Sequence, residues 1–147
     1  MRVDFSGRDQ HVTPLKMSRP LATRLLFEAQ KQPDVEVCGF LSASDEGPHE
    51  IYPVANIAAE PARRFEMDPA GQIAAMKAMR ENGERLLAIY HSHPSAPPEP
   101  SIHDIEGLGY PDALYLIISL NIKGVLEMRA WQRDGEAMVE RVLTVMD

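Results

Sequence analysis

Two histidines and an aspartate lie within fourteen residues of one another in the second half of the chain. His91 and His93 flank a single serine and precede a proline, and Asp104 follows them. Two imidazoles and a carboxylate are three protein ligands, the number that leaves the fourth position of a tetrahedral zinc ion free for water. Such an ion lowers the pKa of its bound water to roughly 7 and supplies a nucleophile at neutral pH. The pattern therefore predicts a hydrolase with one zinc ion.

The spacing of the two histidines is suited to a strand. The continuous apolar run at 86–90 is typical of a buried central strand, and His91 follows it directly. Side chains two residues apart in a strand point to the same face, about 6.5–7 Å apart along the chain, so both imidazoles can lean toward one ion. A proline-rich loop over 94–100 then precedes a short helix predicted over 101–108, whose first turn would present Asp104 to the same ion.

Two more residues have side chains that suit catalysis at this ion. Glu36, in Glu-Val-Cys-Gly near the start of a strand predicted over 35–42, is the candidate to take a proton from the attacking water and pass it to a leaving amine. Ser101 would donate a hydrogen bond from its hydroxyl to the developing oxyanion.

Each of these signals also has a plainer interpretation when it is taken alone. Ser101-x-x-Asp104 is also the pattern of a helix capping box, although Glu or Gln is more usual at the last position. Glu36 alone would be a solvated residue at a strand start, and Cys38 a small buried apolar residue. His103 competes with Asp104, but neighbouring helical side chains point about 100° apart, so only one faces the ion easily. The combination of all these residues in one register favours the metal site.

The rest of the chain supplies the elements that position these residues. Leu21, Leu25 and Ala29 recur at helical spacing after a possible Ser18 cap. Helices interleave with strands early and the last strands form a meander, which indicates an α/β or α+β sheet with flanking helices. The predicted strands cover 15–18, 35–42, 50–54, 86–90, 113–120, 125–133 and 137–145, and the helices begin at Pro20 and run from Pro69, capped by Asp68, to about Glu81.

Composition narrows the function class and the compartment. A chain of 147 residues is most simply one domain, 1–147. Its net charge of −7 disfavours a broad surface for nucleic acid. Cys38 is the single cysteine, which rules out an intramolecular disulfide and fits a reducing compartment. The apolar runs are too short for a signal peptide or a bilayer span, so we expect no membrane partner and a cytoplasmic location.

These residues and their spacing resemble the motif of the JAMM (MPN+) metalloprotease family. The resemblance extends to the Pro-Val-Ala-Asn segment around Asn56 and to Arg-Phe-Glu-Met-Asp-Pro at 64–69. It implies a three-layer α/β fold, similar to that of cytidine deaminases, with a curved mixed β-sheet flanked by helices. It also implies a zinc ligand set that includes Asp104 in preference to His103, a Glu that acts through the zinc water and a Ser that supports the oxyanion. The residues that match the family motif are Glu36, His91, His93, Pro94, Ser101 and Asp104.

The same resemblance implies an activity and a partner. Members of the family hydrolyse peptide or isopeptide bonds next to the carboxyl termini of ubiquitin or ubiquitin-like proteins. This chain looks like the small stand-alone prokaryotic members, which are associated with ubiquitin-like sulfur-carrier proteins that end in Gly-Gly. Such a tail would bind as an added strand in a groove between 64–68 and the loop after His93.

Two other functions are weighed against this one. Some family members lack the metal ligands and serve as scaffolds, so the alternative is a non-catalytic MPN-type interaction module with a structural zinc. A zinc nucleoside deaminase would need His-x-Glu and Pro-Cys-x-x-Cys, which a chain with one cysteine does not contain.

Overall fold

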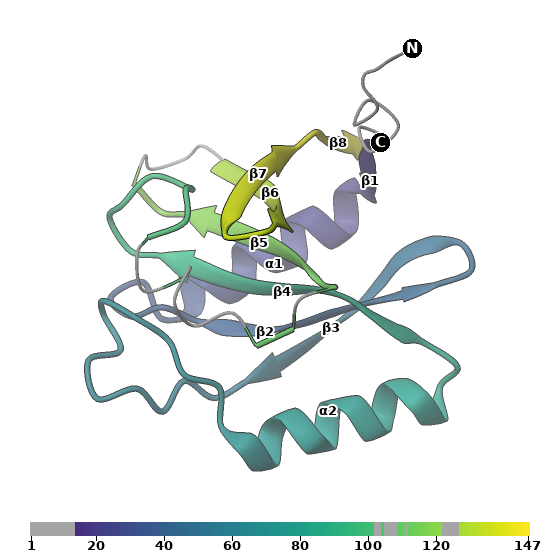
Figure 1. The fold of residues 1–147 in the computed structure, drawn as a ribbon, viewed down its shortest axis with the longest axis horizontal. Coiled ribbons are helices and arrows are strands. Elements are labelled where there is room, and N and C mark those ends of the chain that lie inside the picture. The colour runs from purple at the N-terminus through teal and green to yellow at the C-terminus, as the bar shows by residue number, and fades with distance from the viewer. Residues whose placement is uncertain (1–13, 102–103, 105–108, 111, 122–126) are drawn as a thin grey trace.

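A six-stranded mixed β-sheet forms the centre of the molecule, with the strand order β3-β2-β4-β5-β6-β7 (Figure 1). The computed structural model describes residues 14–101, 104, 109–110, 112–121 and 127–147. Strands β4 and β5 run parallel and the other neighbours run antiparallel. The strands are β2 (Cys38–Ser44), β3 (Gly47–Val54), β4 (Arg85–His93), β5 (Leu114–Ser119), β6 (Glu127–Asp134) and β7 (Ala137–Arg141).

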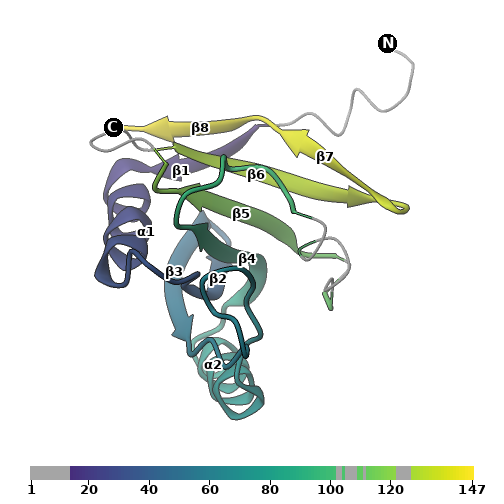
Figure 2. The ribbon, with the colours of Figure 1, turned by 90° about the vertical axis from the view of Figure 1, so that its left-hand side faces the viewer.

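Two helices pack on opposite faces of this sheet (Figures 1 and 2). Helix α1 (Arg19–Lys31) begins after Ser18, whose hydroxyl accepts a hydrogen bond from the Leu21 amide. Helix α2 (Pro69–Glu81) begins after Asp68, which caps it in the same way, and has the bounds that the sequence predicts. Among the described residues, neither helix has the length and apolarity needed to cross a bilayer.

The alternation of side chains along β4 decides which face carries the histidines. Ala88 and Tyr90 belong to the buried cluster on the α1 side, whereas Ile89 belongs to the cluster on the α2 side. His91 and His93 have the same parity as Ile89 and therefore face the α2 side. Ser92 faces the other way, and its hydroxyl accepts a hydrogen bond from the Val37 amide at 2.9 Å.

The sequence prediction was wrong about where the strand after Glu36 begins. It placed Glu36 inside a strand over 35–42, but β2 begins at Cys38. The Glu36 amide instead donates to the carbonyl of Pro61 at 2.7 Å, so a loop partner replaces a strand neighbour. The base candidate therefore lies in the connection that leads into the central sheet. Strand β3 also begins earlier than predicted, at Gly47.

The last predicted strand, 137–145, is two strands with different partners. Strand β7 remains in the main sheet, whereas β8 (Leu143–Met146) pairs in parallel with β1 (Leu15–Ser18) in a separate two-stranded sheet. The Leu15 amide donates to the Val142 carbonyl at 2.8 Å at the point where the chain changes sheets. A continuous alternating pattern contains no sign of this exchange of partners. The helix predicted over 101–108 lies outside the described residues except for its positions 101 and 104.

Gly39 generates a prediction about stability. A Cβ at this position would lie 2.5 Å from the Tyr52 carbonyl oxygen and 2.6 Å from the Tyr90 hydroxyl. We expect Gly39→Ala to lower the free energy of unfolding by about 1–3 kcal/mol, because the backbone of β3 at Tyr52 and the side chain of Tyr90 would have to move away from the new methyl group. Denaturant unfolding of both proteins measures the difference.

Gly109→Ala is the matched control, because a Cβ there meets no atom of the described residues within 4 Å. Its free energy of unfolding should change by no more than about 0.5 kcal/mol. Equal stability of the Gly39 variant and the unaltered chain would refute the close packing at β2.

Candidate metal centre

Four ionisable side chains meet at the carboxyl end of β4. One ligand atom from each of Glu36, His91, His93 and Asp104 lies within 4.8 Å of every other. The two histidines and Glu36 are no more than 4% exposed, and Asp104 is partly buried. Burying so many ionisable groups together is costly unless they are paired or bind a cation.

The distances within this cluster match those of a shared ion. The two Nε2 atoms of His91 and His93 are 3.2 Å apart. Asp104 places Oδ1 at 3.1 Å from the first of these nitrogens and Oδ2 at 3.2 Å from the second. With metal–nitrogen bonds of about 2.0–2.1 Å, a tetrahedral zinc ion holds two nitrogens roughly 3.3 Å apart. The three side chains could therefore hold one metal ion, and their donor set fits zinc.

The tautomer of His93 is set by its second ring nitrogen. Nδ1 lies 2.8 Å from the Pro97 carbonyl oxygen, which can only accept, so Nδ1 carries the hydrogen of the neutral ring. The lone pair of Nε2 is then directed at the cluster. A hydrogen bond of this kind from the second nitrogen is the usual way in which a metal-binding histidine is oriented.

Ser101 and Asp104 form a reciprocal capping pair. The Ser101 amide donates to Oδ2 of Asp104 at 2.8 Å, and the Asp104 amide donates to the Ser101 hydroxyl oxygen at 3.1 Å. The capping box weighed as an alternative is therefore present together with the metal-site geometry. The same carboxylate receives a backbone hydrogen bond and faces both histidines.

Protonation in the cluster follows from burial and from the negative charge of Asp104. Burial disfavours the imidazolium of His91 and lowers its pKa, although Asp104 acts in the opposite direction. Burial also opposes the charge on His93, but hydrogen bonds to Asp104 and to the Pro97 carbonyl outweigh it and raise its pKa. Burial acts against ionised Asp104 too, yet the two histidines hold its pKa well below the usual range. Asp104 is thus available as an anionic ligand.

Glu36 has a different electrostatic environment. Burial, together with the nearby charge of Asp104, raises its pKa to about 7. Its Oε1 is buried and has no hydrogen-bond partner among the described residues. Its backbone is held firmly, because the amide bonds to Pro61 and the carbonyl accepts from the Asn56 side chain at 2.9 Å. A carboxyl group with a pKa near neutrality can both accept and return a proton.

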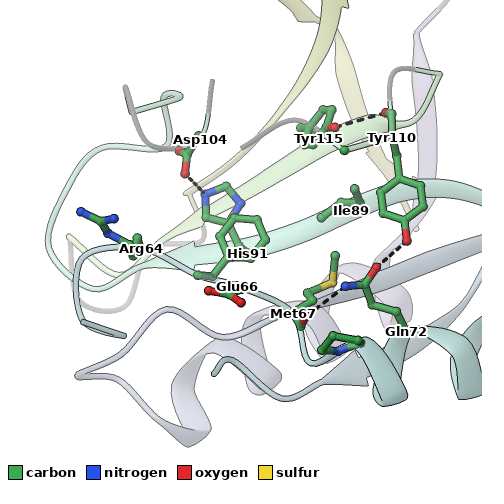
Figure 3. A pocket seen from close by; sticks show the side chains of 12 residues that line it. Arg64, Glu66, Met67, Gln72, Ile89, His91, Asp104, Tyr110 and Tyr115 are labelled. Carbon is green, nitrogen blue, oxygen red and sulfur yellow. Dashed lines mark hydrogen bonds and ion pairs between the residues drawn. The ribbon is translucent and has the colours of Figure 1, made fainter. Parts of the chain in front are cut away.

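A cavity of about 520 Å³ leads to the cluster and includes His91 and Asp104 in its lining (Figure 3). One wall is the segment from Arg64 to Pro69, as the sequence predicts for the groove. The other wall is formed by residues such as Tyr110 and Tyr115. The loop after His93, which the sequence interpretation placed there, does not line this cavity.

That proline-rich loop, 94–100, is instead hydrogen-bonded to the sheet. The Trp131 indole donates to the Pro98 carbonyl at 3.0 Å, and the Ser119 hydroxyl donates to the Ala96 carbonyl at 2.7 Å. These bonds fix the loop that presents the Pro97 carbonyl to His93.

Two residues near the centre were given no role by sequence reasoning. The side chain of Asn56 makes four hydrogen bonds to backbone groups, and Phe65 stacks on the ring of His91. Both residues lie in segments that carry the family resemblance. Their contacts join stretches far apart in sequence, so no local spacing pattern could reveal them.

Comparisons with known proteins agree with this geometry. The profile of a family described as prokaryotic homologs of the JAB domain matches residues 18–134. A desampylase of Haloferax volcanii is 36% identical over 72% of this chain and 76% of its own length. A desampylase of Pyrococcus furiosus is 30% identical over 84% of this chain and 85% of its own. A CysO-cysteine peptidase of Mycobacterium tuberculosis is 26% identical over 86% and 88%, respectively.

Solved structures confirm the predicted α/β fold. The solution structure of a protein from Desulfitobacterium hafniense has a TM-score of 0.80 and 29% identity, and the match covers 90% of this chain and 92% of that one. A JAB1/MPN domain protein from Archaeoglobus fulgidus has a TM-score of 0.59 at 21% identity, over 91% and 99%. Family profile, relatives and fold together show that this chain belongs to the prokaryotic homologs of the JAB domain, within the JAMM/MPN family that its motif resembles, and that it is a hydrolase.

Proposed function

We propose that this chain is a zinc-dependent metallopeptidase that cleaves a peptide or isopeptide bond at the C-terminal tail of a ubiquitin-like, sulfur-carrier type of protein. The observation that carries the proposal is the convergence of Glu36, His91, His93 and Asp104 in one cluster, of which His91 and Asp104 line a cavity. Three of these side chains suit a metal and the fourth suits proton transfer.

His91, His93 and Asp104 would hold the zinc ion. When bound, zinc would supply Lewis-acid activation of water and polarise the scissile carbonyl. The hydrogen bond from His93 to Pro97 keeps the Nε2 lone pair directed at the ion, and the backbone bond from Ser101 keeps the Asp104 carboxylate oriented.

Glu36 would act as general base and then as general acid. Its carboxylate takes the proton of the attacking water and later delivers it to the nitrogen of the leaving amine, so the proton is conserved over the reaction. The Ser101 hydroxyl accepts a hydrogen bond from the Asp104 amide, so its own proton is available to donate to the developing oxyanion.

The cavity wall supports an extended tail as the substrate. Asn56 and Met67 form an antiparallel bridge in which the Ile57 amide donates to the Glu66 carbonyl. In such a bridge the amide of Met67 is directed away from its partner strand, toward the side on which a further strand would add. A Gly-Gly tail has no side chains and could lie close to this edge. The relatives named desampylase and CysO-cysteine peptidase support a substrate of this class.

The competing function is an interaction module in which the zinc only stabilises the fold. A structural zinc site has no need of a buried carboxyl oxygen that lacks a hydrogen-bond partner, and Oε1 of Glu36 is such an atom among the described residues. Measurements of turnover and of metal content separate the two functions.

Glu36→Gln should abolish cleavage and leave the zinc in place. The amide keeps the shape of the side chain but cannot take a proton, so we expect a loss of about 10²–10⁴-fold in kcat. The assay uses a ubiquitin-like carrier joined through Gly-Gly to a short peptide. Glu46→Gln, in an exposed turn, is the matched control and should cleave normally. Full activity of the Glu36 variant would refute its role as the base.

Asp104→Asn should weaken zinc binding. Loss of the one anionic ligand is expected to raise the dissociation constant for zinc about a hundredfold, which corresponds to about 3 kcal/mol. Competition with a chelator measures the dissociation constants of the unaltered chain and of the variant. Asp45→Asn, at an exposed position, should have the dissociation constant of the unaltered chain. An unchanged dissociation constant in the Asp104 variant would exclude Asp104 as a ligand.

Zinc affinity should fall as the pH falls. Because the pKa of His93 is raised, its ring becomes protonated already at a pH above 6.5, the ordinary pKa of histidine. The pKa of His91 is lowered, so that ring stays neutral. Zinc must displace the proton from His93 below its raised pKa, so affinity should drop by up to about tenfold for each pH unit. Chelator competition at pH 8 and pH 6 measures this, and equal affinities at both pH values would contradict it.

A further inference from the structure

His91 and His93 are oriented by different means, although both face the metal site. Nδ1 of His93 has a carbonyl partner at 2.8 Å. Nδ1 of His91 is buried and has no hydrogen-bond partner among the described residues. A metal-binding histidine almost always donates from its second nitrogen to a carboxylate, a carbonyl or water. Some other contact must therefore hold the ring of His91.

The ring of Phe65 provides such a contact. It stacks on the imidazole of His91 with a centroid separation of 4.4 Å and an interplanar angle of 26°. This is the offset or parallel arrangement in which aromatic pairs attract each other beyond simple burial. A stacked ring restricts rotation about χ2 of His91, which is the rotation that would carry Nε2 away from the ion.

The backbone on either side of Phe65 is fixed by one side chain. Asn56 donates from Nδ2 to the Arg64 carbonyl at 3.1 Å and accepts at Oδ1 from the Glu66 amide at 3.0 Å. The same Nδ2 donates to the Glu36 carbonyl at 2.9 Å. Phe65 is therefore held at both neighbouring peptide groups, and its support is tied to the backbone of the base candidate.

We propose that Phe65 is a positioning residue of the metal centre, whose ring holds His91 in the orientation that zinc binding needs and so replaces the missing hydrogen bond. Phe65 also lies on the cavity wall, so the residue that supports a metal ligand belongs to the surface along which the tail would bind. This second point rests on the proposed function, whereas the support of His91 does not.

The test measures the affinity of the protein for Zn²⁺ alone, by competition with a chromophoric chelator and without substrate. Phe65→Leu removes the flat ring but keeps an apolar side chain, and we expect its dissociation constant for zinc to rise about tenfold, as is typical when an outer contact of a ligand is lost. Phe65→Tyr keeps the ring and should restore the dissociation constant to within about twofold of the unaltered value.

Phe40→Leu is the matched control. Phe40 is fully buried on the same face of the sheet and packs edge-on against Tyr110 at 5.5 Å. This change should lower the melting temperature while the dissociation constant for zinc stays the same. Unchanged affinity in Phe65→Leu, or an equal loss in Phe40→Leu, would overturn the positioning role. Neither result bears on the proposed function. The proposed function fails only if the unaltered chain binds no zinc or if the zinc-loaded protein does not cleave the carrier fusion.

Discussion

The convergence of two imidazole lone pairs and one carboxylate at the end of β4 is the constraint on which the rest of this structure depends. The two ring nitrogens are 3.2 Å apart and both lie close to Asp104. Such an arrangement of buried lone pairs is energetically favourable only when a proton or a cation lies between them. The surrounding contacts act to keep these atoms together: the Pro97 carbonyl orients one ring, Phe65 covers the other, and the Ser101 amide holds the carboxylate. These contacts hold the side chains in an arrangement that could bind a metal ion.

The topology of the sheet explains why this cluster lies where it does. Strands β4 and β5 are the parallel pair, so their carboxyl ends share one edge, where loops from both can meet. The loop after β4 uses this arrangement, because its Ala96 carbonyl accepts from Ser119 at the end of β5 and the Leu120 amide donates to the His93 carbonyl. A rigid strand end presents the histidines, and a fastened loop sets the tautomer of one of them.

Local chemistry explains which features could be predicted from the sequence. The bounds of α2 follow from Asp68-Pro69 at its start and Asn82-Gly83 at its end, and the histidine spacing marks the end of a buried strand. The partner of β8 could not be predicted, because a strand pattern does not name the strand it pairs with. Glu36 was singled out from its sequence context, but its place in a loop depends on the distant Pro61 carbonyl.

The roles that local patterns could not reveal are those that connect the centre to its cavity. Asn56 joins the backbone of Glu36 to the backbone around Phe65, and Phe65 in turn contacts His91. The base candidate, a candidate metal ligand and a cavity wall thus share one short chain of contacts. Since coupling between two binding events is reciprocal, a tail that steadies this wall would favour the ion to the same extent that the ion favours the tail.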